Sequence, residues 1–152
     1  MSMPDLILSD AAATEAAGRA LADALRPGDI LLLEGGLGAG KTTLARGLLR
    51  GLGFPGEAPS PTFAILQGYE PPETRLPLAH VDLYRIEDPD EIDELGLDDW
   101  LETGALVIEW PDRLGGRFAR LALAITIETT PDGSRLLTAR LPKSWEARWP
   151  FP

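Results

Sequence analysis

The chain of 152 residues contains no cysteine, which excludes disulfides, thiolate metal ligands and thiol nucleophiles. It also lacks a long apolar run, since no stretch approaches the roughly 20 residues that a membrane-spanning helix needs. The N-terminal MSMPDLILSD has neither the basic start nor the long apolar stretch of a signal peptide. We therefore expect a cytoplasmic protein that makes no membrane contact.

Basic residues are scarce, with 14 Lys and Arg against 24 Asp and Glu and a formal net charge of -10. This balance disfavours direct binding to the phosphate backbone of a nucleic acid. Nine of the acids lie between Glu87 and Glu102, a segment without Lys or Arg. Such a run indicates either a solvated helix face or a docking surface for a basic partner. Any nucleic acid is expected to be held by a partner protein.

The remaining composition, with 44% hydrophobic and 25% charged residues, is that of an ordinary soluble globular protein. A chain of this length predicts one domain over residues 1–152 with a sizeable core. The aromatic tail, residues 143–152, shows no recognisable secondary-structure pattern. Its Trp145, Trp149 and Phe151 are expected either to anchor a protein interface or to pack back on the edge of the domain.

Helix and strand patterns alternate along the chain. Ser9 is a suitable N-cap for an alanine-rich helix over residues 10–25, and the apolar run ILLLE predicts a buried parallel strand at 30–34. The other expected elements are a helix at 41–52, a hairpin from 63–70 and 76–85, one or two short helices within 87–102 broken at Gly96, a strand at 105–110, and a hairpin from 120–128 and 135–141. This order predicts an α/β fold, a P-loop NTPase-like three-layer sandwich whose mixed, largely parallel sheet carries antiparallel hairpin additions.

The segment GGLGAGKTT, residues 35–43, satisfies the pattern G-x-x-x-x-G-K-[ST] between a predicted strand and a predicted helix. Its glycines let successive backbone N–H groups surround phosphate oxygens, and the helix N-terminus adds partial positive charge. Lys41 is expected to reach the β- and γ-phosphates, and the Thr42 hydroxyl to ligate Mg²⁺. The predicted nucleotide-binding residues are Gly35, Gly36, Leu37, Gly38, Ala39, Gly40, Lys41, Thr42 and Thr43. A nucleotide with Mg²⁺ is therefore the expected ligand, and the absence of a guanine-reading N-K-x-D motif argues against a GTPase.

A P-loop site needs a carboxylate at the end of a neighbouring strand to hold the metal, and Asp82 and Glu109 both follow apolar runs. The short aspartate suits a tight Mg²⁺ shell, whereas the glutamate reaches further towards an attacking water. We therefore assign Asp82 to the metal with Thr42, and Glu109 to polarising or orienting the water. Lys41, Asp82 and Glu109 form the predicted catalytic set.

Three further features are open to more than one interpretation. In the loop APSPTFA, Ser60 and Thr62 flank a proline, so one of these hydroxyls could sense the γ-phosphate as a switch threonine does, or the loop could be a plain turn. His80 shares a strand face with Asp82, so it is expected to have a structural role or to lie beside the site. Arg85 could pair with a phosphate or with the acidic run that follows it.

Five motifs follow one another along the chain: GGLGAGKTTLARGLLRGLG, SPTF, HVDLYR, ELGLDDWL and IEWPDRL. They have the order and wording of the TsaE (YjeE) family, which this chain resembles. The resemblance covers roughly residues 33–114 and is much more specific than the P-loop alone. It implies a bacterial P-loop ATPase that hydrolyses ATP to ADP and phosphate. It also implies an accessory role in making threonylcarbamoyladenosine in tRNA, with TsaB and TsaD as partners and contact with tRNA only through that complex.

When the family's motifs are matched to this sequence, the resemblance implies that Asp82 is the metal aspartate and Glu109 the water-facing glutamate. It also places a neighbouring tryptophan on Trp110 and the switch-like residues on Ser60 and Thr62. One departure is visible at Gly36, where family members usually carry an acidic residue. Phosphate binding is still expected, because the cradle does not require a side chain at that position.

Two other functions are compatible with a P-loop. A small-molecule kinase needs a lid that brings arginines over the transferred phosphate. The candidates after residue 109 are Arg113, Arg117 and Arg120, and no lid-like helix is predicted around them. The second alternative is a binding module in which nucleotide orders the fold and hydrolysis is incidental.

Overall fold

A computed structural model describes residues 3–36, 38–56 and 65–152, and within these ranges seven strands form one mixed sheet in the order β1-β7-β6-β2-β5-β4-β3. The strands are β1 (Asp5–Leu8), β2 (Ile30–Glu34), β3 (Leu66–Tyr69), β4 (Leu78–Asp82), β5 (Ala105–Glu109), β6 (Leu123–Thr129) and β7 (Arg135–Arg140). The four central strands β6, β2, β5 and β4 are mutually parallel. The outer pairs β1–β7, β6–β7 and β3–β4 are antiparallel, so both predicted hairpins are present.

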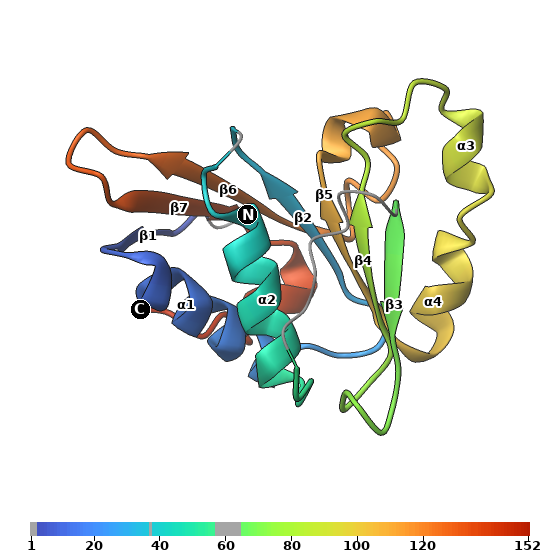
Figure 1. The fold of residues 1–152 in the computed structure, drawn as a ribbon, viewed down its shortest axis with the longest axis horizontal. Helices are drawn as coiled ribbons and strands as arrows, with labels where there is room; N and C mark the ends of the chain where they lie inside the picture. Colours follow the sequence, from blue (N-terminus) through green and yellow to red (C-terminus); the bar gives the residue numbers. More distant parts are fainter. Residues whose placement is uncertain (1–2, 37, 57–64) are drawn as a thin grey trace.

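Helices cover both faces of this sheet. They are α1 (Ala11–Ala24), α2 (Lys41–Gly51), α3 (Asp90–Asp93) and α4 (Leu97–Thr103), with 3₁₀ turns at Pro111–Leu114 and Lys143–Trp145. Helices α1 and α2 lie together on one side of the sheet, and α3 and α4 lie on the other (Figure 1). This arrangement confirms the predicted α/β three-layer fold.

The alternation of side chains along β2 explains why its apolar run is continuous. Leu31 and Leu33 belong to the cluster under α1 and α2, while Ile30 and Leu32 belong to the cluster under α3 and α4. Both faces of a central parallel strand are covered, so every position except the terminal glutamate is buried. Strand β2 therefore runs through the middle of the core, and the P-loop begins where the strand ends at the edge of the sheet.

The structure corrects the start of the first helix and adds a strand. The N-cap of α1 is Asp10, not Ser9, because a carboxylate oxygen of Asp10 accepts the Ala13 N–H at 2.8 Å. Strand β1 was not expected from the sequence. It is a four-residue edge strand, and its partner β7 lies at the other end of the chain.

The aromatic tail packs back on the domain. The Trp145 side chain is fully buried in the cluster under α1 and α2, and Trp149 and Phe151 pack against the same cluster. The two latter rings meet edge to face with centroids 5.1 Å apart. Of the two interpretations of the tail, the structure therefore supports packing on the domain edge.

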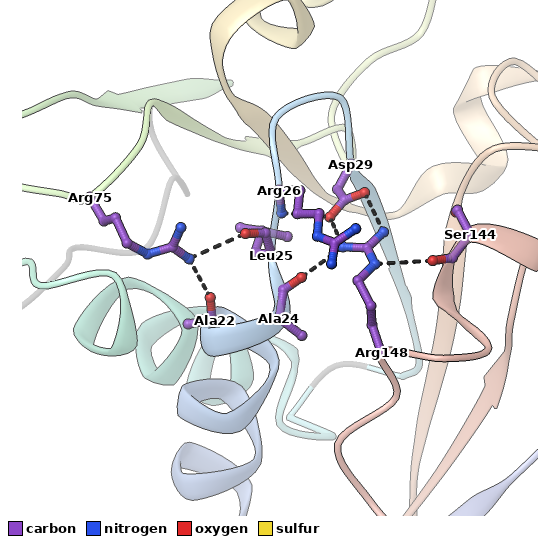
Figure 2. Close-up of polar contacts among 8 residues, drawn as sticks. All are labelled: Ala22, Ala24, Leu25, Arg26, Asp29, Arg75, Ser144 and Arg148. Atoms are coloured by element: carbon purple, nitrogen blue, oxygen red, sulfur yellow. Dashed lines mark hydrogen bonds and ion pairs between the residues drawn. The ribbon is translucent and has the colours of Figure 1, made fainter.

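Two arginines from distant segments hold the carboxyl end of α1 (Figure 2). Arg75 donates to the carbonyl oxygens of Ala22 at 2.6 Å and Leu25 at 3.2 Å. Arg148, from the tail, donates to Ala24 O at 2.7 Å and binds both carboxylate oxygens of Asp29 at 2.7 and 2.9 Å. These bonds satisfy the carbonyls of Ala24 and Leu25 at the helix end, and they give Ala22 O a second donor beside the Leu25 N–H at 3.2 Å.

The acidic run contains α3 and α4, separated at Gly96 as expected. Its nine carboxylate residues between Glu87 and Glu102 are all exposed, while Ile92 and Leu97 are buried against the sheet. This pattern is that of a solvated helix face. Among the described residues, no helix is long and apolar enough to cross a membrane.

Candidate active site

The parallel strands β2, β4, β5 and β6 all end at the same edge of the sheet, where α1 and α2 begin. In open α/β sheets, ligands bind in the crevice outside the carboxyl ends of the strands. A cleft of about 620 Å³ lies here, a volume within the range of small-molecule sites. The residues that line it are Asp10, Ala11, Thr14, Gly38, Ala39, Gly40, Lys41, Thr42, Thr43, Ile65, Asp82, Tyr84, Arg85, Glu109, Trp110, Gly133 and Arg135.

The P-loop passes very close to strand β6. At Gly35 the backbone has φ 149°, and a Cβ atom there would lie 2.3 Å from the carbonyl oxygen of Ile127, so only glycine fits. At Gly36 a Cβ would meet nothing within 4 Å. The absence of an acidic side chain at Gly36 is therefore not imposed by packing. Leu37 lies outside the described residues.

Lys41, the first residue of α2, is buried at the floor of the cleft with 5% of its surface exposed. Its ammonium donates to Gly35 O at 2.7 Å and lies 3.4 Å from the centroid of the Trp110 ring. Burial lowers the pKa of Lys41, and the nearby carboxylates Glu109, Asp82 and Asp112 oppose this shift. The lysine is thus a partly desolvated cation, which favours a close anionic ligand.

Asp82 and Glu109 are direct neighbours in the register of β4 and β5, so the two predicted carboxylates meet at the sheet edge. The Thr42 hydroxyl donates to Glu109 Oε1 at 3.4 Å. His80 Nε2 lies 2.6 Å from Glu109 Oε2, and both side chains are almost fully buried. The structure therefore joins Lys41, Thr42, Asp82 and Glu109 in one cleft and adds His80 as a direct partner of the glutamate.

Burial raises the pKa of Asp82, and the negative charge of Glu109 raises it further. A hydrogen bond from the Tyr84 N–H to Asp82 Oδ1 at 2.9 Å acts in the opposite direction, as do His80 and Lys41. A nearby cation would stabilise the ionised form of Asp82, and Thr42 supplies a hydroxyl oxygen in the same cleft. These donors fit Mg²⁺, which commonly takes few protein ligands and completes its shell with water and phosphate. The described residues contain no cluster of three or more His, Cys, Asp or Glu that could hold a metal without such help.

Trp110 forms the wall of the cleft above the lysine. It has a left-handed backbone with φ 60°, which is unusual for a bulky residue. Its ring packs on Tyr84 with centroids 4.8 Å apart, and Arg113 approaches the Tyr84 carbonyl oxygen at 3.5 Å. The Trp110 ring covers one side of the Lys41 ammonium, and Tyr84 packs on that ring.

Another part of the cleft lining was not predicted from the sequence. Asp10 and Thr14 reach the cleft from the N-cap and first turn of α1, Gly133 from the β6–β7 turn and Arg135 from the start of β7. No local motif marks these residues, and only the fold brings them to the P-loop. Arg85 does line the cleft, as one of its two interpretations requires.

The structure does not bring the other residues singled out in the sequence into the described cleft. Ser60 and Thr62 fall outside the described residues, and Arg113, Arg117 and Arg120 do not line the cleft. Arg117 instead pairs with Asp93 of α3. None of the three arginines considered for a kinase lid therefore lines the cleft formed by the described residues.

Comparison with known proteins supports the resemblance seen in the motifs. The family model for Threonylcarbamoyl adenosine biosynthesis protein TsaE matches residues 8–137. The protein tRNA threonylcarbamoyladenosine biosynthesis protein TsaE of Bacillus subtilis is 40% identical over 126 residues, which cover 82% of this chain and 77% of the relative. The protein of the same name from Synechocystis is 44% identical over 115 residues, covering 72% and 71%. The crystal structure of Bacillus subtilis YdiB superimposes with a TM-score of 0.74 at 31% identity, covering 91% of this chain and 84% of that one. The motifs, the fold and these matches together show that the chain belongs to the TsaE family.

Proposed function

We propose that this chain is a Mg²⁺-dependent ATPase that acts as an accessory subunit of the bacterial machinery for threonylcarbamoyladenosine in tRNA. The observation that carries the proposal is the meeting of Lys41, Thr42, Asp82 and Glu109 in one cleft at the start of α2. This set contains the parts that phosphoryl transfer to water requires: an anion cradle, a cation, a metal carboxylate and a group that orients water.

Phosphate binding is assigned to the loop and to Lys41. The first turn of α2 presents backbone N–H groups and the positive end of the helix dipole to the cleft. The Lys41 ammonium now bonds to one neutral carbonyl, and a phosphate oxygen is the stronger acceptor. We expect the ammonium to exchange this contact for the phosphates while Trp110 keeps it desolvated.

Water activation is assigned to Glu109. Its carboxylate is held on one oxygen by His80 and on the other by Thr42, so its direction is set before substrate binds. Bound Mg²⁺ supplies charge neutralisation for the phosphates, and Asp82 and Thr42 would hold it. The protein contributes orientation and electrostatics, with in-line attack of water and little covalent help.

The accessory role rests on the family and on charge. The relatives are named for the biosynthesis of threonylcarbamoyladenosine in tRNA. A net charge of -10 does not suit direct tRNA binding, so tRNA would be reached through TsaB and TsaD in the cytoplasm. The exposed acids of the 87–102 run leave that surface open to a basic partner.

Phosphate release tests the proposal when it is measured for the chain alone, with TsaB and TsaD, and with a panel of small kinase acceptors. Stimulation by the two partners supports the accessory ATPase. Transfer of labelled phosphate to a small acceptor would instead establish a kinase, and partner binding that needs nucleotide but not its hydrolysis would establish a binding module.

Two variants divide the roles within the site. Lys41→Ala should abolish turnover and weaken ATP binding, because it removes the cation from the cradle. Glu109→Gln should lose turnover by about 100-fold or more while keeping ATP binding, because the amide cannot act on the water. Turnover equal to that of the parent in either variant contradicts the assignment.

A further inference from the structure

Arg135 reaches across from the β6–β7 turn to the backbone of the P-loop. It is the first residue of β7, paired with Thr129 of β6 and Leu8 of β1. Its Nε donates to the carbonyl oxygen of Ala39 at 2.9 Å, and its Nη2 donates to that of Gly38 at 3.3 Å. The guanidinium thus bonds two successive carbonyls of the loop that would receive phosphate.

These bonds set the direction of the loop's N–H groups. In a trans peptide the C=O of one residue and the N–H of the next point in opposite directions. Holding the Ala39 carbonyl on the guanidinium therefore turns the Gly40 N–H away from Arg135. Holding the Gly38 carbonyl does the same for the Ala39 N–H, which donates to Gly36 O at 3.2 Å. Since glycine flanks Ala39 on both sides, the backbone dihedrals alone resist rotation of the Ala39–Gly40 peptide only weakly.

The guanidinium is itself held in place by the turn from which it comes. Its Nη1 donates to Gly133 O at 3.0 Å. Asp132 Oδ1 organises that turn by accepting the Ser134 N–H at 2.9 Å, the Ser134 hydroxyl at 2.7 Å and the Thr130 hydroxyl. These bonds lower the pKa of Asp132 to about 2, so the carboxylate stays ionised at neutral pH. The guanidinium of Arg135 is therefore hydrogen-bonded both to an internally bonded turn and to the P-loop.

We propose that Arg135 is a positioning residue: by binding the carbonyl oxygens of Gly38 and Ala39 it orients the Gly38–Ala39 and Ala39–Gly40 peptide groups, so that the Gly40 N–H faces the phosphate. The inference rests on the proposed function in that the ligand of the loop is a nucleotide phosphate. A residue in contact with phosphate would act only when nucleotide is bound, whereas a positioning residue orders the loop without it.

The test measures ¹⁵N relaxation of the loop amides in the protein without nucleotide, and ADP and ATP binding by calorimetry. The variants are Arg135→Ala, Arg135→Lys and, as a matched control, Arg140→Ala at the exposed far end of the same strand. In Arg135→Ala the order parameters of Ala39 and Gly40 should fall from about 0.85 to below about 0.6, and affinity for ADP and ATP should fall by roughly 10-fold. Arg135→Lys should be intermediate, because an ammonium lacks the fork that bonds two carbonyls at once. Arg140→Ala should match the parent.

Two results would overturn the inference. Loss of affinity with unchanged order parameters would show that Arg135 contacts the ligand directly, and unchanged affinity with a mobile loop would show that the ordering has no effect on binding. Failure of the parent itself to bind ATP would count against the proposed function, while the relaxation data would still decide whether Arg135 orders the loop. A thermal melt of each variant separates these effects from unfolding.

Discussion

His80 and Glu109 form a buried pair, with Nε2 of the imidazole 2.6 Å from Oε2 of the carboxylate. Because a carboxylate oxygen can only accept, the hydrogen between these atoms belongs to Nε2, while the other ring nitrogen, Nδ1, is buried and has no hydrogen-bond partner among the described residues. The histidine therefore donates to Glu109 and leaves Oε1 facing Thr42.

Replacing His80 should reduce turnover more than nucleotide binding. His80→Ala removes the donor that orients Glu109, so kcat for phosphate release should fall by about 10- to 100-fold while KM for ATP changes by less than about 3-fold. His80→Gln retains an N–H donor and should recover part of the loss. Steady-state kinetics in the presence of TsaB and TsaD provide the measurement, and an unchanged kcat in His80→Ala would show that Glu109 needs no such support.

Asp82→Asn should stabilise the protein in the absence of metal. Folding raises the pKa of Asp82 above its usual value of 3.8. Between pH 3.8 and the raised pKa, the folded state therefore binds more protons than the unfolded state. Unfolding free energy therefore falls as pH rises through that window, and an amide avoids the loss. We expect Tm in EDTA at pH 7 to rise by about 2 °C, and the difference from the parent to disappear below pH 3.8. The same variant should lose Mg²⁺-dependent turnover, and a lower Tm at pH 7 would contradict the electrostatic explanation.

Arg148→Met should destabilise the fold without affecting catalysis. The variant keeps apolar volume beside Trp145, over which the guanidinium now lies at 4.2 Å, but it strips Asp29 of its bidentate partner and Ala24 of its cap (Figure 2). Breaking such a nearly buried pair costs about 3 kcal/mol, to be measured by urea denaturation. Because none of these residues lines the cleft, ATP affinity at 25 °C should be unchanged. Arg140→Met is the exposed control, and equal midpoints for both variants would contradict the prediction.

Gly47→Ala should push apart helices α1 and α2, which pack together on one side of the sheet. A Cβ at Gly47 would lie 2.1 Å from the backbone carbonyl oxygen of Glu15 in α1, which is too close for any side chain. Although alanine is the better helix former by about 1 kcal/mol, the clash should dominate and cost about 1–3 kcal/mol net. Gly36→Ala, with nothing within 4 Å of the new Cβ, should leave the unfolding free energy unchanged. A stabilised Gly47→Ala would mean that α1 and α2 can move apart freely.

Features encoded over a short segment could be predicted from the sequence. The strand, P-loop and α2 form one continuous pattern of apolar residues, glycines and Lys41, and the break between α3 and α4 follows from Gly96. The carboxylates Asp82 and Glu109 could be identified because each ends an apolar run. Their pairing required the register of β4 on β5, which the sequence does not state.

Features that depend on distant segments could not be predicted. Four residues of β1 form a strand only because β7 offers an edge, and Arg135 reaches the P-loop from almost a hundred residues away along the chain. Ser9 and Asp10 are both good helix caps, so the choice between them depends on which side chain reaches the Ala13 N–H. The burial of Trp145 required the cluster under α1 and α2 to be known.

The aligned ends of β4 and β5 make the length of these strands as important as their composition. One residue inserted between Leu78 and Asp82 would carry the aspartate past Glu109 and turn it to the opposite face, beneath α3 and α4. Insertions in loops beyond the strand ends would leave that alignment intact. We therefore expect natural variation in length to accumulate outside these ten positions, and a designer who grafts this chemistry elsewhere must copy the spacing as well as the residues.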